Sequence, residues 1–188
     1  MTDPMNRVVE DVERELLQIE NRIESLNKES ASGSIQIIEE EVTKKLEVIG
    51  SRILKLESQR PSRESLKNEY GRHCEAYKAI IDVHLSDVVK SEEELARCSN
   101  YLQKHLENHK QIQECLQTNQ MKLEYAVSLL ESHPETLLDA KRRLDQLNNR
   151  LTEKISNTTE LSKRITRLSN DASSYKTKLQ SLVEEPNR

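Results

Sequence analysis

The most constraining feature of this sequence of 188 residues is the spacing of its apolar side chains. In the first segment, successive apolar positions are separated alternately by three and four residues. They are Val9, Val12, Leu16, Ile19, Ile23 and Leu26. This spacing places all of them on one face of an α-helix, and it is typical of a helix that packs against other helices. The segment from about residue 5 to about residue 29 is therefore predicted to be helical.

Three further segments repeat the pattern, and they are predicted to be helices at about 35–58, 63–131 and 134–185. The second carries Ile38, Val42, Leu46, Ile49, Ile53 and Leu56. The third carries Leu66, Tyr70, Cys74, Tyr77, Ile81, Leu85, Val88, Leu95, Leu102, His109, Leu116, Leu123 and Leu130. The fourth carries Leu144, Leu147, Leu151, Ile155, Thr158, Leu161, Ile165, Leu168, Ala172, Tyr175, Leu179 and Leu182. The predicted fold class is all-α, an elongated set of coiled-coil helical hairpins or an open helical bundle.

The composition favours thin apolar seams between long helices rather than one compact core. Charged residues make up 33% of the chain, the hydrophobic set makes up only 34%, and Phe and Trp are absent. A compact core normally needs large apolar side chains. Low hydrophobicity with high charge also describes disordered chains. The formal net charge of only −4, the scarcity of Gly and Pro, and the strong periodicity argue against disorder.

Breaks in the pattern suggest two domains. The small polar stretch 30–34 predicts a turn, so residues 1–60 are expected to form an N-terminal helical hairpin with helices at about 5–29 and 35–58. Pairing of these helices with partner chains is an open alternative. Pro61 ends this domain. Ser132 and Glu135 have the spacing of a capping box before a new helix, so 61–188 is expected to form a long antiparallel hairpin with helices at about 63–131 and 134–185. A kink between residues 84 and 94 is left open.

Few residues suggest chemistry. Cys98, His105 and His109 could share one helix face and offer metal ligands, but a fourth ligand is missing, and polar seam residues often fix helix register. We therefore favour the second interpretation and expect no metal and no cofactor. The three cysteines lack the signatures of catalytic thiols, and no glycine-rich phosphate loop is present. The chain is expected not to be an enzyme.

Charge, hydropathy and cysteine content also limit the partners and the cellular location that we expect. The net charge of −4 does not suggest a nucleic-acid partner. No apolar run is long enough for a signal peptide or a membrane span, so direct membrane insertion is not expected. Three widely spaced cysteines do not form a disulfide framework, so a reducing compartment, the cytosol or the nucleus, is expected. Of these two, we expect a cytoplasmic location.

An apolar stripe on a helix must be buried against another helix, and the first stripe is the best candidate for an external partner because it is regular and rich in β-branched residues. The predicted partner-binding seam combines this stripe with the end of the fourth helix. Its residues are Val9, Val12, Leu16, Ile19, Ile23, Leu26, Ile165, Leu168, Tyr175, Leu179 and Leu182.

The layout resembles the dynactin subunit 3 family, the small subunit of the dynactin shoulder. Similar to that family are a short Leu/Glu-rich opening helix at 12–26, a second seam at 42–56, and a Leu-Leu-acidic-Ser-His turn with Pro-Glu at 129–135. An Arg-Leu-x-x-Leu stretch at 143–147 and a closing segment at 175–183 complete the resemblance. The family's aromatic residues near the C-terminus and its Gln-rich stretch after the turn are missing here.

The resemblance implies a structural subunit of the dynein activator that packs with dynamitin and the largest dynactin subunit, associated with the cytoskeleton in microtubule-based transport. Two other assemblies are compatible with the sequence. One is a coiled-coil complex of the kinetochore or spindle. The other is a SNARE-related vesicle-tethering complex, since residues 39–56 also resemble the N-terminal region of a Golgi SNARE of the membrin type.

Overall fold

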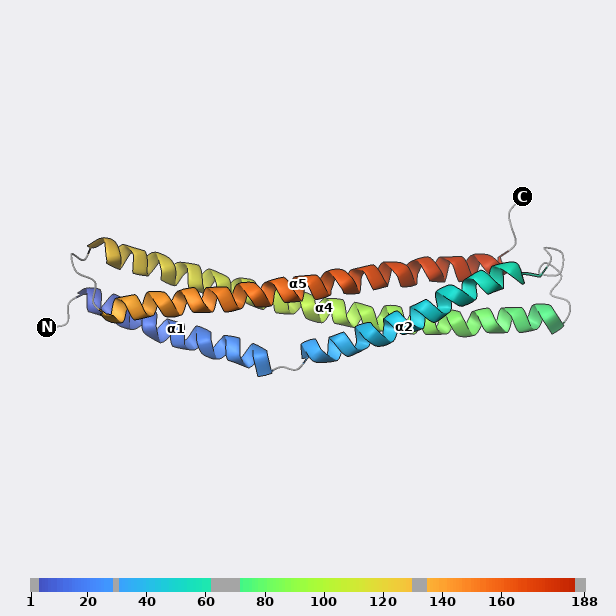
Figure 1. Ribbon diagram of the computed structural model, residues 1–188, viewed down its shortest axis with the longest axis horizontal. Coiled ribbons are helices and arrows are strands. Elements are labelled where there is room, and N and C mark those ends of the chain that lie inside the picture. Colours follow the sequence, from blue (N-terminus) through green and yellow to red (C-terminus); the bar gives the residue numbers. More distant parts are fainter. Residues whose placement is uncertain (1–3, 29–30, 62–71, 130–134, 185–188) are drawn as a thin grey trace. The chain divides into compact units, whose positions relative to one another are not determined.

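A computed structural model describes residues 4–28, 31–61, 72–129 and 135–184. These residues form four α-helices and no strand (Figure 1). The helices are α1 (Pro4–Lys28), α2 (Ala31–Ser58), α4 (Arg72–Leu129) and α5 (Glu135–Val183). The all-α prediction is confirmed.

The helix bounds agree closely with the apolar spacing but differ at the start of α2. Residues 31–34, expected in a turn, belong to the first turn of α2. α4 runs without interruption through 84–94, where a kink had been left open. The start of the predicted helix at residue 63 and the capping serine at 132 lie outside the described residues.

The described helices divide into two compact units, and this division differs from the predicted one at residue 60. The α1 unit combines α1 with α4 from Leu102 onward and α5 as far as Glu160. The α2 unit combines α2 with α4 as far as Tyr101 and α5 from Leu161 onward. α1 and α2 therefore belong to different units, and the expected N-terminal hairpin is corrected on this point. Both α4 and α5 contribute to each unit.

The lengths of the helices explain why α1 and α2 belong to different units. α4 has 58 residues, and α1 and α2 have 25 and 28. At about 1.5 Å per residue, α4 is about 87 Å long, roughly twice the length of α1 or α2. Its apolar stripe therefore offers enough contact area for both shorter helices, one in each unit.

The core of the α1 unit lies where three apolar stripes meet. α1 lies beside the α4 and α5 segments of this unit (Figure 1). The core side chains come from all three: Val12, Leu16, Ile19 and Ile23 from α1, Ile112, Leu116 and Leu123 from α4, and Leu137, Ala140, Leu144, Leu147 and Leu151 from α5. Burial of apolar area on this scale is the main stabilising contribution for helices whose own propensity is marginal.

The α2 unit has a similar core, and hydrogen bonds between segments hold the ends of two of its helices. α2 contributes Ile35, Val42, Leu46, Ile49, Ile53 and Leu56. The Tyr77 hydroxyl of α4 donates a 2.8 Å hydrogen bond to the carbonyl oxygen of Leu56, near the end of α2. Arg60 donates to the carbonyl oxygens of Ser181 and Glu184 at the end of α5, 3.4 and 3.1 Å away. These bonds satisfy carbonyls that have no partner within a helix end.

The buried face of α4 keeps its spacing even where the residue is polar. His84, Ser91, His109 and Asn119 are each at least 95% buried. Leu85, expected in the seam, is only half-buried, because the alternating steps from Tyr77 lead to position 84. Continuity of the helix face thus outweighs the hydrophobicity of the neighbouring residue.

Candidate partner-binding surface

The predicted seam on α1 is buried against other helices of the same chain. Val12, Leu16, Ile19 and Ile23 are at most 3% exposed and belong to the core of the α1 unit. The side chains of the other two members, at positions 9 and 26, lie outside those described. The expectation that this stripe is free for a partner is therefore corrected. The physical reason is that α4 and α5 supply apolar stripes of their own, which cover it.

The predicted seam on α5 is also internal. Ile165, Leu179 and Leu182 are at most 5% exposed within the α2 unit, and Leu168 and Tyr175 are half-buried. The structure therefore does not bring the α1 and α5 halves of the predicted seam together in one unit.

Tyr175 of α5 packs closely against Gly50 of α2 in the α2 unit. A Cβ atom added to Gly50 would lie 2.9 Å from the Tyr175 hydroxyl oxygen. The Lys178 Nζ lies 6.0 Å from the centre of the same ring, within the range of a cation–π contact. Arg164 of α5 holds Glu39 of α2 through Nε at 2.6 Å from Oε1. Tyr175 therefore has a structural role in this helix pairing.

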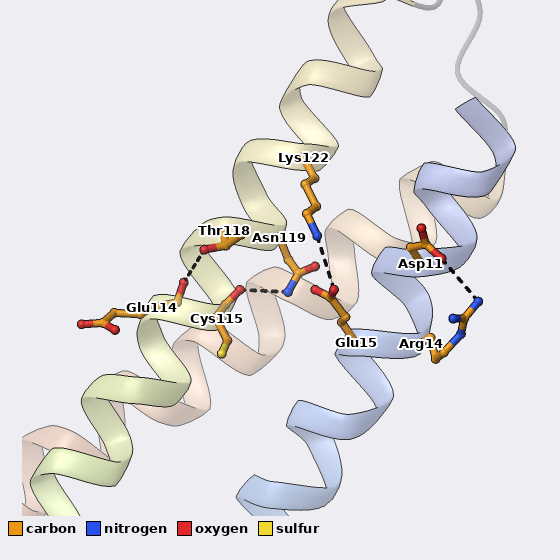
Figure 2. Close-up of polar contacts among 8 residues, drawn as sticks. All are labelled: Asp11, Arg14, Glu15, Glu114, Cys115, Thr118, Asn119 and Lys122. Atoms are coloured by element: carbon orange, nitrogen blue, oxygen red, sulfur yellow. Dashed lines mark hydrogen bonds and ion pairs between the residues drawn. The ribbon is translucent and has the colours of Figure 1, made fainter. Parts of the chain in front are cut away.

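The groove between α1 and α4, in the α1 unit, is polar and bridged. It encloses about 570 Å³ and is lined by Glu15, Gln18, Ile19, Arg22, Gln111, Glu114, Cys115, Thr118, Asn119 and Lys122. Figure 2 shows Lys122 reaching across from α4 to Glu15 of α1, with Nζ 3.3 Å from Oε1. Asn119 turns back to its own helix and donates to the Cys115 carbonyl oxygen at 2.8 Å. Most of the side chains that line this groove are polar, and one ion pair joins its two walls.

The groove between α2 and α4, in the α2 unit, has a different lining. It encloses about 350 Å³ between Lys44, Lys45, Val48, Ile49 and Arg52 of α2 and Val83, His84 and Asp87 of α4. Val48 and Val83 are 52% and 60% exposed. We call this surface the α2/α4 groove. Its exposed valines and cations make it the best candidate for contact with another molecule.

Burial of His84 and His109 disfavours the protonated form of each ring. Burial lowers the pKa of His84, and nearby Arg52 lowers it further, while Asp87 opposes the shift. Burial likewise lowers the pKa of His109, assisted by His105 and Lys154. Neither ring nitrogen of His84 has a hydrogen-bond partner among the described residues, nor does Nδ1 of His109. Both side chains are therefore neutral core residues near pH 7.

The residues that the sequence suggested for metal binding or catalysis, His105, His109 and the three cysteines, all belong to α4. The His105 and His109 rings are 6.0 Å apart between centres. The described residues contain no group of three or more His, Cys, Asp and Glu side chains that could hold a metal ion. Cys74 and Cys98 are buried, and burial raises the pKa of the Cys98 thiol, whereas Cys115 is exposed. Among the described helices, none has a stretch apolar enough to cross a membrane.

Sequence reasoning missed the α2/α4 groove because it followed the apolar residues of the regular seam. Val48 and Val83 lie outside that seam, on exposed helix faces. The sequence held one signal, because Val48 stands among the charged residues Lys44, Lys45 and Arg52 and outside the apolar stripe of its helix. The sequence could not show that the two valines share one groove.

No protein-family profile matches this chain, and comparisons with curated proteins and with solved structures found no similar protein.

Proposed function

We propose that this chain is a non-enzymatic scaffold subunit that binds helices of partner proteins within a multiprotein assembly. The observation that carries the proposal is the α2/α4 groove, where Val48 and Val83 remain more than half exposed beside three cations that have no ion pair among the described residues. Side chains of this kind on an otherwise charged helical surface favour contact with a partner.

The fold supports the same function. Helices with apolar stripes at alternating steps of three and four residues are typical of coiled-coil hairpins and open bundles, which is the finer architecture that we propose for this chain. The buried polar side chains on α4, such as His84 and Asn119, have the kind of placement that fixes helix register in such assemblies. Specific pairing of helices is what a scaffold subunit needs.

The resemblance to the dynactin subunit 3 family supplies the first candidate assembly. In that case the chain is a shoulder subunit in the cytoplasm that supports dynein-driven transport along microtubules, with dynamitin and the largest dynactin subunit as partners. A coiled-coil subunit of the kinetochore or spindle and a SNARE-related tethering component are the alternatives.

Affinity purification of the tagged full-length chain tests the proposal. Proteins that remain bound are quantified by mass spectrometry, and the purified complex is sized by sedimentation. The scaffold function predicts recovery of helical partner proteins in stoichiometric amount. Dynamitin with the largest dynactin subunit supports the dynactin assembly, and a different set of helical proteins supports one of the alternatives.

Two results would count against the proposal. One is recovery of the chain as a lone monomer under conditions where its helices are intact by circular dichroism. The other is turnover of a small-molecule substrate by the purified chain, because an enzyme would not need a helical partner.

A further inference from the structure

The exposed apolar side chains of the α2/α4 groove stand on opposite walls. Val48 belongs to α2 and Val83 belongs to α4. Ile80, one turn before Val83 on α4, is 46% exposed. Single exposed apolar residues are common on protein surfaces, but Val48 and Val83 line one groove from both helices and can contact the same ligand.

The rim of this groove is cationic. Lys44, Lys45 and Arg52 all lie on the α2 wall, and Asp87 on α4 is the only acid among the described residues that line the groove. None of the three cations has an ion pair with a residue that the structure describes. An acidic ligand would therefore gain new charge contacts there without first displacing an internal carboxylate.

The opposite flank of α2 provides the contrast. The groove between α2 and α5 in the same unit encloses about 500 Å³ and is lined by Glu47, Gly50, Ser51, Ile53, Leu54, Glu57, Tyr175 and Lys178. Two carboxylates and one ammonium group face it. The two flanks of α2 therefore differ in charge, and an acidic partner is directed to the α4 side.

We infer that the α2/α4 groove is a docking site for an acidic amphipathic helix of a partner protein. Apolar residues of that helix pack on Val48 and Val83, and its carboxylates flank Lys44, Lys45 and Arg52. The partner adds a fourth helix to the three segments of the α2 unit. This inference rests on the proposed scaffold function and names the partner's chemistry and its place of contact.

The dimensions of the groove suit a helix. Its α2 wall extends from Lys44 to Arg52, which corresponds to about 12 Å along the helix axis. A groove between two packed helices accepts the side-chain ridge of a third element, as in other cases where an amphipathic helix binds in a groove. A basic helix would instead face three positive charges, which is unfavourable.

Fluorescence anisotropy with the full-length chain tests the docking site. The probe is a labelled synthetic helix of about 18 residues, about 27 Å long, with Leu at alternating steps of three and four and Glu on the flanking positions. A matched probe carries Lys in place of every Glu. We expect saturable binding of the Glu probe, at least about tenfold weaker binding of the Lys probe, and weaker binding of the Glu probe as salt is raised.

Variants locate the binding. Val83→Glu removes an apolar contact and adds a repulsive charge, so it should weaken binding of the Glu probe by at least about tenfold. Lys44→Glu should reduce the preference for the Glu probe over the Lys probe. Leu138→Glu is the matched control, because Leu138 is 52% exposed on α5 of the α1 unit, and its variant should bind the probe normally. Circular dichroism checks that each variant stays helical.

Three outcomes overturn the docking site: equal binding of both probes, equal loss of binding in the Val83→Glu and Leu138→Glu variants, and no binding of the Glu probe. Self-association of the chain that Val83→Glu abolishes would assign the groove to a second copy instead. If the probe fails while affinity purification with Val83→Glu still recovers stoichiometric partners, the docking site falls and the scaffold function stands. If neither the unmodified chain nor the Val83→Glu variant recovers a partner, the scaffold function itself is contradicted.

Discussion

In the α1 unit, the groove between α1 and α4 is crossed by the ion pair of Lys122 and Glu15. In the α2 unit, the corresponding groove between α2 and α4 is lined by exposed Val48 and Val83, with cations that lack ion pairs among the described residues. The same helix α4 forms one wall of each groove. The difference shows that similar apolar cores can support outer faces of different chemistry: an ion pair within the chain crosses one groove, and the other leaves valines and cations exposed.

The largest expected effect tests whether α1 is held by a core contact or by its surface. Leu16→Ala should destabilise the protein by about 2–5 kcal/mol, because Leu16 is fully buried in the α1 unit and the substitution leaves a cavity. Leu17→Ala is the control, since its 53% exposed side chain should contribute less than about 0.5 kcal/mol. Urea unfolding followed by circular dichroism measures both. Equal effects would contradict the packing of α1 described above.

The burial of Leu16 also changes how one obvious interface test must be interpreted. Replacing Leu16 and Ile19 with Asp would place two unpaired charges in the core of the α1 unit. We expect this variant to lose the α1 packing. A loss of partner binding in it would therefore reflect unfolding, whereas Val83→Glu changes an exposed side chain.

The next effect concerns the buried histidines, one in each unit. The pKa values of His84 and His109 are lowered in the folded protein, mainly by burial, from an unfolded value of about 6.5. Above that pH both states are neutral and the full stability is present. As the pH falls below it, the unfolded chain takes up protons that the folded chain resists, so stability decreases.

Unfolding by urea at about pH 7.5 and about pH 5.5, on either side of the unfolded histidine pKa, measures this loss. His109→Leu should reduce the acid sensitivity and stabilise the protein at the lower pH by about 1–3 kcal/mol, since a partly unsatisfied polar ring is replaced by an apolar side chain. His84→Leu should act in the same direction in the α2 unit. An unchanged pH dependence in both variants would show that other groups cause it.

A smaller effect tests the close approach of α2 and α5. Gly50→Ala adds a methyl group against the Tyr175 hydroxyl, which opposes the gain in helix propensity of about 1 kcal/mol. Tyr175→Phe removes the nearest atom, so the double variant should be more stable than the sum of the single effects by about 0.5–1.5 kcal/mol. Gly33→Ala is the matched control, because its added methyl would meet nothing within 4 Å. Additive effects would contradict the contact.

The smallest effect concerns the ion pair that crosses the α1/α4 groove. The Lys122 and Glu15 side chains are 42% and 43% exposed. A double-mutant cycle with Lys122→Ala and Glu15→Ala should give a coupling of about 0.2–1 kcal/mol that declines in high salt. A coupling that salt leaves unchanged would indicate a role beyond surface electrostatics, and would weaken the contrast between the two grooves.

Much of the local structure could be predicted from the sequence. The alternating spacing identified all four described helices, and it placed Leu16, Leu144 and Leu179 on buried faces. It failed at Leu85 because hydrophobicity was preferred to regular spacing, and the structure buries His84 instead. It also assigned residues 31–34 to a turn, although α2 includes them, since their small polar character does not prevent a helix stabilised by later packing.

The candidate site was harder to predict. The sequence analysis selected the most regular stripe on α1 as the partner seam, but α4 and α5 cover it. Val48 and Val83 are 35 positions apart in the sequence and carry no common pattern. Their shared groove depends on the pairing of two helices, which a spacing within one helix cannot specify.

The sequence by itself determined where the helices lie and which face of each is buried, because helix geometry fixes which side chains share a face. The tertiary structure alone decided which faces meet. Many helices with similar stripes can pair, and the choice depends on length, direction and specific contacts such as Tyr77 with Leu56 and Gly50 with Tyr175. That choice placed α1 and α2 in different units, closed the predicted seam, and left the valines of the α2/α4 groove exposed.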